Sequence, residues 1–281
     1  MNKHLLKEFI ENAIREDVGD GDHSTLASIP ENATGKVQLL VKEAGILAGV
    51  DIAADVFRLL QPDIVFVKFL EDGTRIKPGE IAFKVEGRVH TLLKAERLVL
   101  NIMQRMSGIA TATSVYADKL AGLHTKVLDT RKTTPGMRML EKEAVRIGGG
   151  TNHRMGLYDM IMLKDNHIDF AGGIEKAIKA VQDYLKNKGK DLKIEIEVRN
   201  MDELKEVLRV GGVHRIMLDN FDIPTTRAAV EMIAGRYETE SSGGITLDTL
   251  RDYAETGVDF ISVGALTHHI RSLDLSLKAI N

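Results

Sequence analysis

The spacing of apolar residues becomes regular after Thr125. Short apolar runs, each typical of a buried β-strand, alternate with amphipathic segments of helical period. The runs that predict strands are residues 125–129, 159–164, 193–198, 214–219, 237–241 and 259–264. The segments that predict helices are residues 173–187, 201–210, 225–234 and 246–257. This α/β alternation predicts a parallel sheet covered by helices, and the pattern alone leaves both a doubly wound sheet and a closed barrel open.

The chain before about Gly108 has a mixed pattern. An amphipathic helix is predicted over residues 5–16, and a long helical segment over 91–122 could link two domains. Strand-like runs lie between them, at residues 36–42, 63–70 and 80–87. The sequence therefore predicts two domains of different construction.

Polar residues at the ends of the later strands favour the barrel. Nearly every predicted strand is followed by charged, amide or glycine-rich positions, namely 129–132, 164–167, Glu197, 219–220, 241–244 and Gly264. In a (β/α) barrel the carboxyl ends of all strands converge on one mouth, where active sites are built. A doubly wound sheet would concentrate such residues at one switch point.

Composition narrows the class of protein. The chain has 281 residues, of which 43% are hydrophobic and 28% charged, and it contains no cysteine and no apolar run long enough to span a membrane. We expect a cytoplasmic globular protein without disulfides. The net charge of −3 argues against a nucleic-acid surface. Residues 129–168 carry seven Lys/Arg against five Asp/Glu, which leaves −5 elsewhere and suggests a small anionic ligand.

Five basic side chains follow consecutive predicted strands or loops: Arg131, Lys132, His153, Arg154 and Lys164. Arginine offers a planar fork for carboxylate or phosphate, and lysine offers a point charge. Ordinary surface solvation is the alternative for each of them taken singly. Ser242, Gly243 and Gly264 come at strand ends, where backbone N–H groups can approach a phosphate.

Two carboxylates, Glu197 and Asp219, end neighbouring predicted strands. They could hold Mg²⁺, directly or through water, or contact sugar hydroxyls. The alternative is a structural ion pair with the barrel lysines, and Glu195 could share either role. The predicted ligand is small and polyanionic, such as a sugar phosphate or diphosphate. A Schiff-base aldolase is the rival, because a lysine at a barrel strand end is also its signature.

Several motifs together resemble one known family. They are residues 16–25, 95–111, 129–138, 148–167, 194–198, 216–220, 240–244 and 262–268, in order along almost the whole chain. In these segments the sequence resembles the quinolinate phosphoribosyltransferases, also called nicotinate-nucleotide pyrophosphorylases (carboxylating). The resemblance implies an N-terminal α/β sandwich domain over residues 1–108, completed by residues 269–281, and an α/β barrel domain of about six to seven parallel strands over residues 109–268.

The resemblance also implies a reaction and its partners. The family joins quinolinate to phosphoribosyl diphosphate with Mg²⁺, giving nicotinate mononucleotide, diphosphate and CO₂ for de novo NAD biosynthesis. A homodimer or higher oligomer is implied, in which Arg97 reaches the neighbouring subunit's site. No nucleic-acid or membrane partner is expected. A paralogue encoded at molybdenum loci, acting on a different acceptor, and a non-catalytic anion-binding subunit are the alternatives.

The resemblance also implies roles for individual residues. Lys132, Lys164, Glu197 and Asp219 are the expected catalytic residues, and the last two are the expected metal ligands. The expected substrate-binding residues are Arg97, Arg131, Lys132, His153, Arg154, Lys164, Glu197, Asp219, Ser242, Gly243, Gly264 and His268.

Overall fold

The computed structural model describes residues 1–280, which divide into two compact units. The N-terminal unit contains residues 1–114, 133–149 and 266–280, and the barrel unit contains residues 115–132 and 150–265. The segment 133–149, which the sequence assigned to the barrel domain, therefore clusters with the N-terminal unit. The chain passes between the two units four times, and each unit is described separately below.

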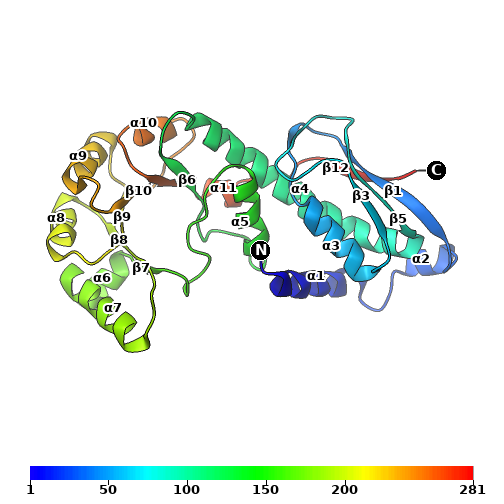
Figure 1. Ribbon diagram of the computed structural model, residues 1–281, viewed down its shortest axis with the longest axis horizontal. Helices are drawn as coiled ribbons and strands as arrows, with labels where there is room; N and C mark the ends of the chain where they lie inside the picture. The colour runs from blue at the N-terminus through cyan, green and yellow to red at the C-terminus, as the bar shows by residue number, and fades with distance from the viewer. Residues whose placement is uncertain (281) are drawn as a thin grey trace. The chain divides into compact units, whose positions relative to one another are not determined.

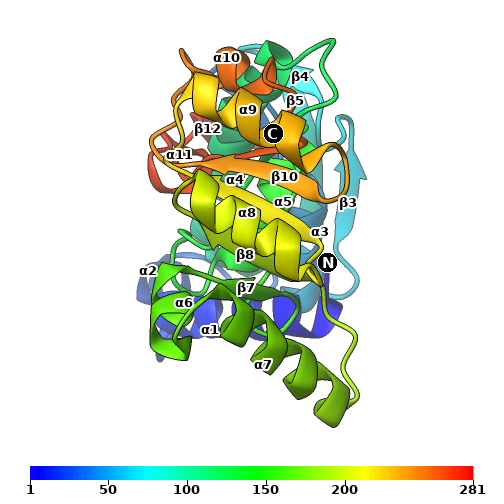
Figure 2. The same cartoon turned by 90° about the vertical axis from the view of Figure 1, so that its left-hand side faces the viewer.

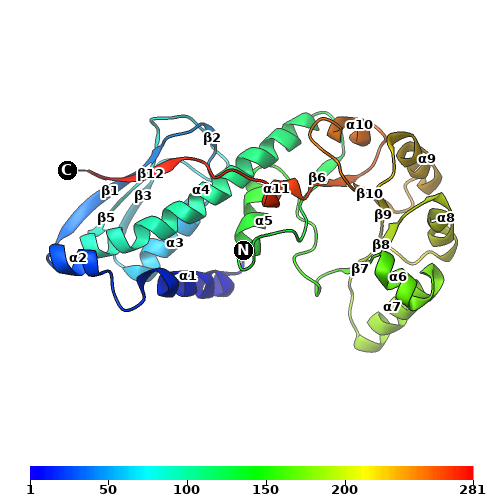
Figure 3. The same ribbon diagram turned by 180° about the vertical axis from the view of Figure 1, so that it is seen from behind.

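The N-terminal unit is built on a four-stranded antiparallel sheet in the order β12-β1-β5-β3. Its strands are β1 (Thr34–Val41), β3 (Val65–Lys68), β5 (Ile81–Arg88) and β12 (Leu275–Ile280). A two-stranded sheet of β2 (Gly45–Ile46) and β4 (Arg75–Ile76) lies apart from it. Figure 3 shows β12, from the end of the chain, lying beside β1.

The helices of this unit are α1 (Lys3–Val18), α2 (His23–Ser28), α3 (Val50–Leu60), α5 (Arg138–Ile147) and most of α4 (Val89–Lys119). Helix α3 packs on the sheet through Phe57, whose ring centroid lies 6.5 Å from that of Phe83 on β5. Phe66 on β3 stacks on Phe83 at 4.6 Å. Offset and tilted aromatic pairs of this kind stabilise a core beyond the area that they bury.

The barrel unit contains a six-stranded parallel sheet in the order β6-β11-β10-β9-β8-β7. Its strands are β6 (Lys126–Leu128), β7 (Ile161–Leu163), β8 (Ile194–Val198), β9 (Arg215–Asp219), β10 (Glu238–Ser242) and β11 (Phe260–Ser262). Each strand from β7 to β10 pairs with the next in sequence, and the first strand, β6, pairs with the last, β11. The strand order has no reversal, so the topology is that of a barrel and not of a doubly wound sheet.

The sheet is not closed by hydrogen bonds between β6 and β7. On the free side of β6, Leu128 makes one isolated parallel bridge with Thr151. This single bridge stands where a seventh strand would lie. The α/β fold class with an N-terminal sheet and a barrel of six to seven parallel strands is therefore confirmed, with the barrel open beside Thr151.

Helices α6 (Asp165–Ala171), α7 (Ile174–Lys188), α8 (Met201–Val210), α9 (Ile223–Ile233) and α10 (Leu250–Ala254) connect these strands. Figures 1 and 2 show α7, α8 and α9 along the outer face of the sheet. Asn200 and Asp222 cap α8 and α9, because their side-chain oxygens accept the first free N–H groups. Within residues 1–280, no helix combines the length and apolar character that crossing a membrane requires.

Candidate active site

The carboxyl ends of the parallel strands gather the polar residues that the sequence singled out. Because neighbouring strands here are parallel, residues at or just beyond their carboxyl ends lie along one edge of the sheet. Those residues are Arg131 and Lys132 after β6, Lys164 after β7, Glu197 on β8, Asp219 on β9, Ser242 on β10 and Gly264 after β11. Asp219 and Ser242 are direct register partners across β9 and β10.

Glu197 and Lys164 form the best-defined pair at this edge. The Nζ of Lys164 lies 3.4 Å from Oε2 of Glu197, whose residue is 7% exposed. Burial raises the pKa of Glu197, and the charge of Asp219 raises it further, while Lys164 opposes both. The charge of Asp219 therefore acts on Glu197, and a cation beside Glu197 stabilises its ionised form.

A tight turn at Asn220 follows β9 and contacts the end of β10. Asn220 adopts a left-handed conformation with φ of 56°, and its backbone N–H donates to the carbonyl of Ser242 at 2.8 Å. Its side-chain Nδ2 donates to Asp219 at 2.7 Å. Gly243 has φ of +100°, and a Cβ there would lie 2.9 Å from the Asn220 nitrogen. Glycine is therefore required at this position by both conformation and space.

The segment after the Thr151 bridge carries Arg154, which is 9% exposed. Its Nη1 donates to the carbonyl of Met160 at 3.2 Å. Burial lowers the pKa of Arg154, and the nearby positive charge of Arg131 lowers it further. The positive charge of Arg131 therefore acts on the buried guanidinium of Arg154, and this concentration of positive charge favours the binding of an anion.

Asp129 fixes the backbone from which these residues project. It is fully buried at the end of β6, and its Oδ1 accepts the backbone N–H of His153 at 2.8 Å. Its own N–H donates to the carbonyl of Thr151 at 3.1 Å. Asp129 thus ties the 129–132 segment to the 151–154 segment, a role that the sequence did not predict for it.

His153 faces the interior of the sheet. Its side chain is 6% exposed, and Nε2 lies 2.9 Å from Oε2 of Glu195 and 3.5 Å from Oε2 of Glu240. Burial alone would lower the pKa of His153, but the two carboxylates outweigh it and raise the pKa to about 9. Its predicted contact with substrate stays a prediction, since this ring nitrogen is directed at buried acids.

Arg215 completes this interior cluster. Its Nη1 lies 3.1 Å from Oε2 of Glu240, its Nη2 donates to Glu238 at 3.0 Å, and its guanidinium stacks 4.1 Å from the ring centroid of Phe260. The ligand atoms of His153, Glu195 and Glu240 lie within 4.8 Å of one another, as a metal site would require. Since Arg215 already neutralises Glu240, we interpret the cluster as a charge-compensated network.

Sequence reasoning missed Glu240 and Arg215 as members of this network. A signal was available, because charged residues recur at every second position, at 195 and 197 in the otherwise apolar β8 and at 238 and 240 in the polar β10. Alternate positions point to the same face of a strand. Burial of that face requires the charges to pair with one another.

Two of the predicted residues belong to the N-terminal unit. Arg97 is exposed on α4, and no hydrogen bond or ion pair joins its side chain to another residue among positions 1–280. His268 ends the short helix α11 (Ala265–His268) and is also exposed, with its ring 4.3 Å from that of His269.

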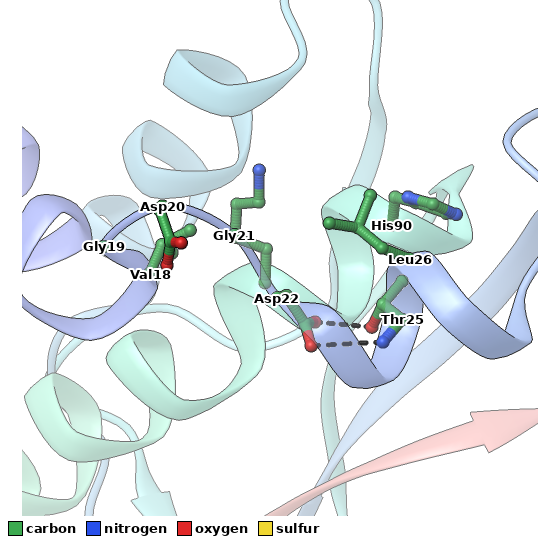
Figure 4. Close-up of a pocket in the computed structure, with 9 residues that line it drawn as sticks. Val18, Gly19, Asp20, Gly21, Asp22, Thr25, Leu26 and His90 are labelled. Atoms are coloured by element: carbon green, nitrogen blue, oxygen red, sulfur yellow. Dashed lines mark hydrogen bonds between the residues drawn. The ribbon is translucent and has the colours of Figure 1, made fainter.

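A cavity of about 280 Å³ lies in the N-terminal unit, between the end of α1 and the start of α4 (Figure 4). Asp22, on its wall, accepts from both the N–H and the hydroxyl of Thr25 and so caps α2. His90 and Lys94 line the cavity from α4. None of the predicted site residues lines it.

Comparison with known proteins places the whole chain in one family. Residues 22–107 match the family described as "Quinolinate phosphoribosyl transferase, N-terminal domain", and residues 109–278 match its C-terminal domain. The chain is 46% identical to "Nicotinate-nucleotide pyrophosphorylase [carboxylating], chloroplastic" of Arabidopsis thaliana, over 97% of this chain and 82% of that protein. It is 41% identical to the "Probable nicotinate-nucleotide pyrophosphorylase [carboxylating]" of Bacillus subtilis, over 99% and 94%.

Solved structures agree with these sequence matches. NadC from Streptococcus pyogenes superposes with a TM-score of 0.92 at 39% identity, covering 100% of this chain and 99% of that one. The nicotinate-nucleotide pyrophosphorylase from Francisella tularensis gives 0.91 at 36% identity, covering 100% and 98%. The barrel, its cationic edge and these matches define a phosphoribosyltransferase. More specifically, the chain belongs to the quinolinate phosphoribosyltransferase family.

Proposed function

We propose that this enzyme transfers the phosphoribosyl group of phosphoribosyl diphosphate to quinolinate and removes one carboxylate, giving nicotinate mononucleotide, diphosphate and CO₂ in de novo NAD biosynthesis. The names of its relatives support this reaction. The observation that carries the proposal is the single sheet edge at which cations follow β6 and β7 while carboxylates end β8 and β9. Both substrates are polyanions, and one of them develops positive charge on its sugar during the reaction.

Quinolinate carries two carboxylates, and Arg131, Lys132 and Arg154 are the groups that we assign to them. The effect of the Arg131 charge on Arg154 supports this assignment, because an anion beside both guanidinium groups would offset it. Arginine can bind a carboxylate through two parallel hydrogen bonds, which fixes the orientation of the ring. His153 remains a further candidate for this site.

Phosphoribosyl diphosphate would bind along the remainder of the edge. Ser242, Gly243 and Gly264 offer hydroxyl and backbone N–H groups to its 5′-phosphate, since glycine lets the backbone approach closely. Lys164 would meet the diphosphate. His268 is proposed as a further phosphate contact.

Mg²⁺ is the expected cofactor, and Glu197 and Asp219 suit it. Both are carboxylates, which are hard oxygen ligands, and the pKa of Glu197 responds to the charge of Asp219. The ion, when bound, would neutralise charge on the departing diphosphate. Ionised Glu197 and Asp219 would also stabilise positive charge as it develops at the anomeric carbon of the ribose.

Decarboxylation needs positioning more than a strong base. Once the pyridine nitrogen carries ribose, its positive charge stabilises the carbanion left when the 2-carboxylate departs as CO₂, and that carbon then takes up one proton to give nicotinate mononucleotide. The protein's part is then to hold the ring by its other carboxylate and to exclude water. The same cations would serve both steps.

We further propose that the active enzyme is a homodimer or a higher homo-oligomer, in which Arg97 reaches the site of a neighbouring subunit. Its exposure on α4, without a partner in the described part of its own chain, supports this. A cytoplasmic location stays a prediction. The names of plant relatives include "chloroplastic" and "mitochondrial", and those words apply to the plant proteins.

Purified enzyme with phosphoribosyl diphosphate, Mg²⁺ and quinolinate provides the test, with nicotinate as a parallel acceptor. We expect nicotinate mononucleotide and CO₂ in equal amounts from quinolinate, and no turnover of nicotinate. Folded protein that binds phosphoribosyl diphosphate but leaves quinolinate unchanged would refute the proposal. A covalent adduct trapped by borohydride at Lys132 or Lys164 would instead identify an aldolase.

A further inference from the structure

Arg105, near the middle of α4, forms a buried hydrogen-bonded fork. Its Nε donates to Oε1 of Glu141 on α5 at 2.7 Å, and Glu141 is fully buried. Its Nη2 donates to the hydroxyl of Thr134 at 2.9 Å and to the carbonyl of Thr267 at 3.1 Å. The second oxygen of Glu141 accepts the backbone N–H of Thr134 at 3.1 Å.

The groups that Arg105 holds lie beside residues to which a substrate-binding role is assigned. Thr134 comes two residues after Lys132 and three after Arg131 in the chain. Thr267 immediately precedes His268 in α11. One guanidinium therefore joins two segments that are separated by more than 130 positions in sequence.

The chemistry of this position calls for arginine. A guanidinium has five donors in a fixed plane, so it can meet a carboxylate, a hydroxyl and a carbonyl at once, whereas an ammonium group is a point donor without a fixed plane. The side chain of Arg105 is 25% exposed, while its partner Glu141 is not exposed at all. Removal of Arg105 alone would leave a buried carboxylate with an uncompensated charge.

We propose that Arg105 is a positioning residue for the reaction, acting with Glu141 to set the start of the 133–138 segment and the place of α11. It does not touch substrate in this proposal. Through Thr134 it fixes the chain that follows Arg131 and Lys132, and through Thr267 it fixes His268. The inference rests on the function proposed above, because that function assigns those three residues to substrate.

A displacement of the supported segments would appear first in substrate affinity. A shift of about 1 Å in a binding group can cost on the order of 100-fold in rate. Loss of binding interactions that are equal in the ground state and the transition state raises KM and leaves kcat unchanged. We therefore expect a rise in the KM for quinolinate of about tenfold or more in Arg105→Gln, with a smaller change in kcat.

The kinetic test compares four variants. Arg105→Gln removes the fork, and Arg105→Lys keeps a donor for Glu141, so its KM should lie between those of Arg105→Gln and the wild type. The double variant Arg105→Met/Glu141→Met removes both buried charges, which protects the fold, and should still show the high KM. Arg146→Gln is the control. It breaks an exposed ion pair between Arg146 and Glu143 within α5 and should leave the KM within about twofold of the wild-type value.

Amide hydrogen exchange supplies a readout that does not require turnover. In Arg105→Gln, residues 133–137 and 266–269 should exchange faster together, while residues 143–147 at the other end of α5 stay protected. Faster exchange in only one segment would overturn the proposal, as would normal KM values in both the single and the double variant. If wild-type enzyme failed to use quinolinate, the proposed function would fail, yet the exchange result would still decide whether Arg105 positions both segments.

Discussion

The imidazole Nε2 of His153 lies 2.9 Å from Oε2 of Glu195 inside the barrel unit. Glu195 is fully buried, and Glu240 brings a second buried carboxylate to the same ring. The Nε2 side of His153 therefore faces two acids that otherwise have only Arg215 nearby, while its Nδ1 accepts the backbone N–H of Arg154 at 2.7 Å. Glu197 is two residues further along β8 than Glu195 and faces the same side of the strand. The network therefore lies further than Glu197 from the carboxyl end of β8.

Replacing His153 by alanine should destabilise the protein by about 3–5 kcal/mol, because it leaves buried carboxylates short of a partner. His124→Ala is the control, since that histidine is exposed and 3.8 Å from Asp259, and its loss should cost less than about 1 kcal/mol. Urea unfolding of both variants measures the difference. Equal stability of His153→Ala and His124→Ala would contradict this account of the network.

The same histidine makes stability depend on pH. Its folded pKa of about 9 lies above the ordinary value of 6.5, so its contribution is fully present below pH 6.5 and is lost as pH rises toward 9. Wild-type protein should lose more stability between pH 6.5 and 9 than the double variant His153→Ala/Glu195→Gln does, because burial raises the pKa of Glu195 to about 7, in the same window. Unfolding curves at the two pH values, recorded for both proteins, provide the test, and parallel losses would show that another group is responsible.

Asp72 should make the free energy of unfolding depend on pH in a second, lower range. Its Oδ1 accepts the N–H of Val50 at the start of α3 at 2.8 Å, and burial raises the pKa of Asp72 to about 6. Because the folded protein binds this proton more tightly than the unfolded chain, its contribution is present below about pH 4 and is lost as pH rises through 6. Asp72→Asn, which keeps the acceptor, should remove this part of the slope. The control is Asp55→Asn on α3, which leaves Asp72 in place and should keep this pH dependence of stability.

Two adjacent glycines give a matched pair at the proposed phosphate site. Gly243→Ala would force the Asn220 turn to move, whereas a Cβ at Gly244 meets open space and adds only the strain of a φ of +62°. That strain is about 1–2 kcal/mol. We expect Gly243→Ala to raise the KM for phosphoribosyl diphosphate at least tenfold and Gly244→Ala to change it much less. Similar KM values in the two variants would exclude a role for the turn in phosphate binding.

Lys164 should set the acid side of the pH–activity profile. Burial raises the pKa of Glu197 and Lys164 opposes this, so Lys164→Gln should raise that pKa further. Ionised Glu197 is the form that would bind Mg²⁺, and the acid limb of kcat/KM should therefore move to higher pH. Lys193→Gln, which removes a lysine 3.5 Å from Glu238, is the control. An unmoved limb in Lys164→Gln would show that Glu197 does not limit activity.

The sequence predicted those features that depend on local pattern. Periodicity located β8 and β9 and their ends, because a buried parallel strand is a short apolar run that stops at its polar terminus. It could not pair Arg215 with Glu240, since that contact depends on which strands are neighbours and in what register. It also assigned residues 133–149 to the barrel, because they lie between two predicted barrel strands, 125–129 and 159–164. Only tertiary contacts such as that of Arg105 with Glu141 associate this segment with α4.

Binding of quinolinate to Arg131→Ala tests the central claim most directly, with Arg251→Ala on helix α10 as the control. Calorimetry in the presence of Mg²⁺ separates affinity from turnover. The account predicts at least a tenfold loss of quinolinate affinity in Arg131→Ala and wild-type affinity in Arg251→Ala. Wild-type affinity in Arg131→Ala, with the protein folded, would contradict the placement of the substrate's carboxylates at the end of β6.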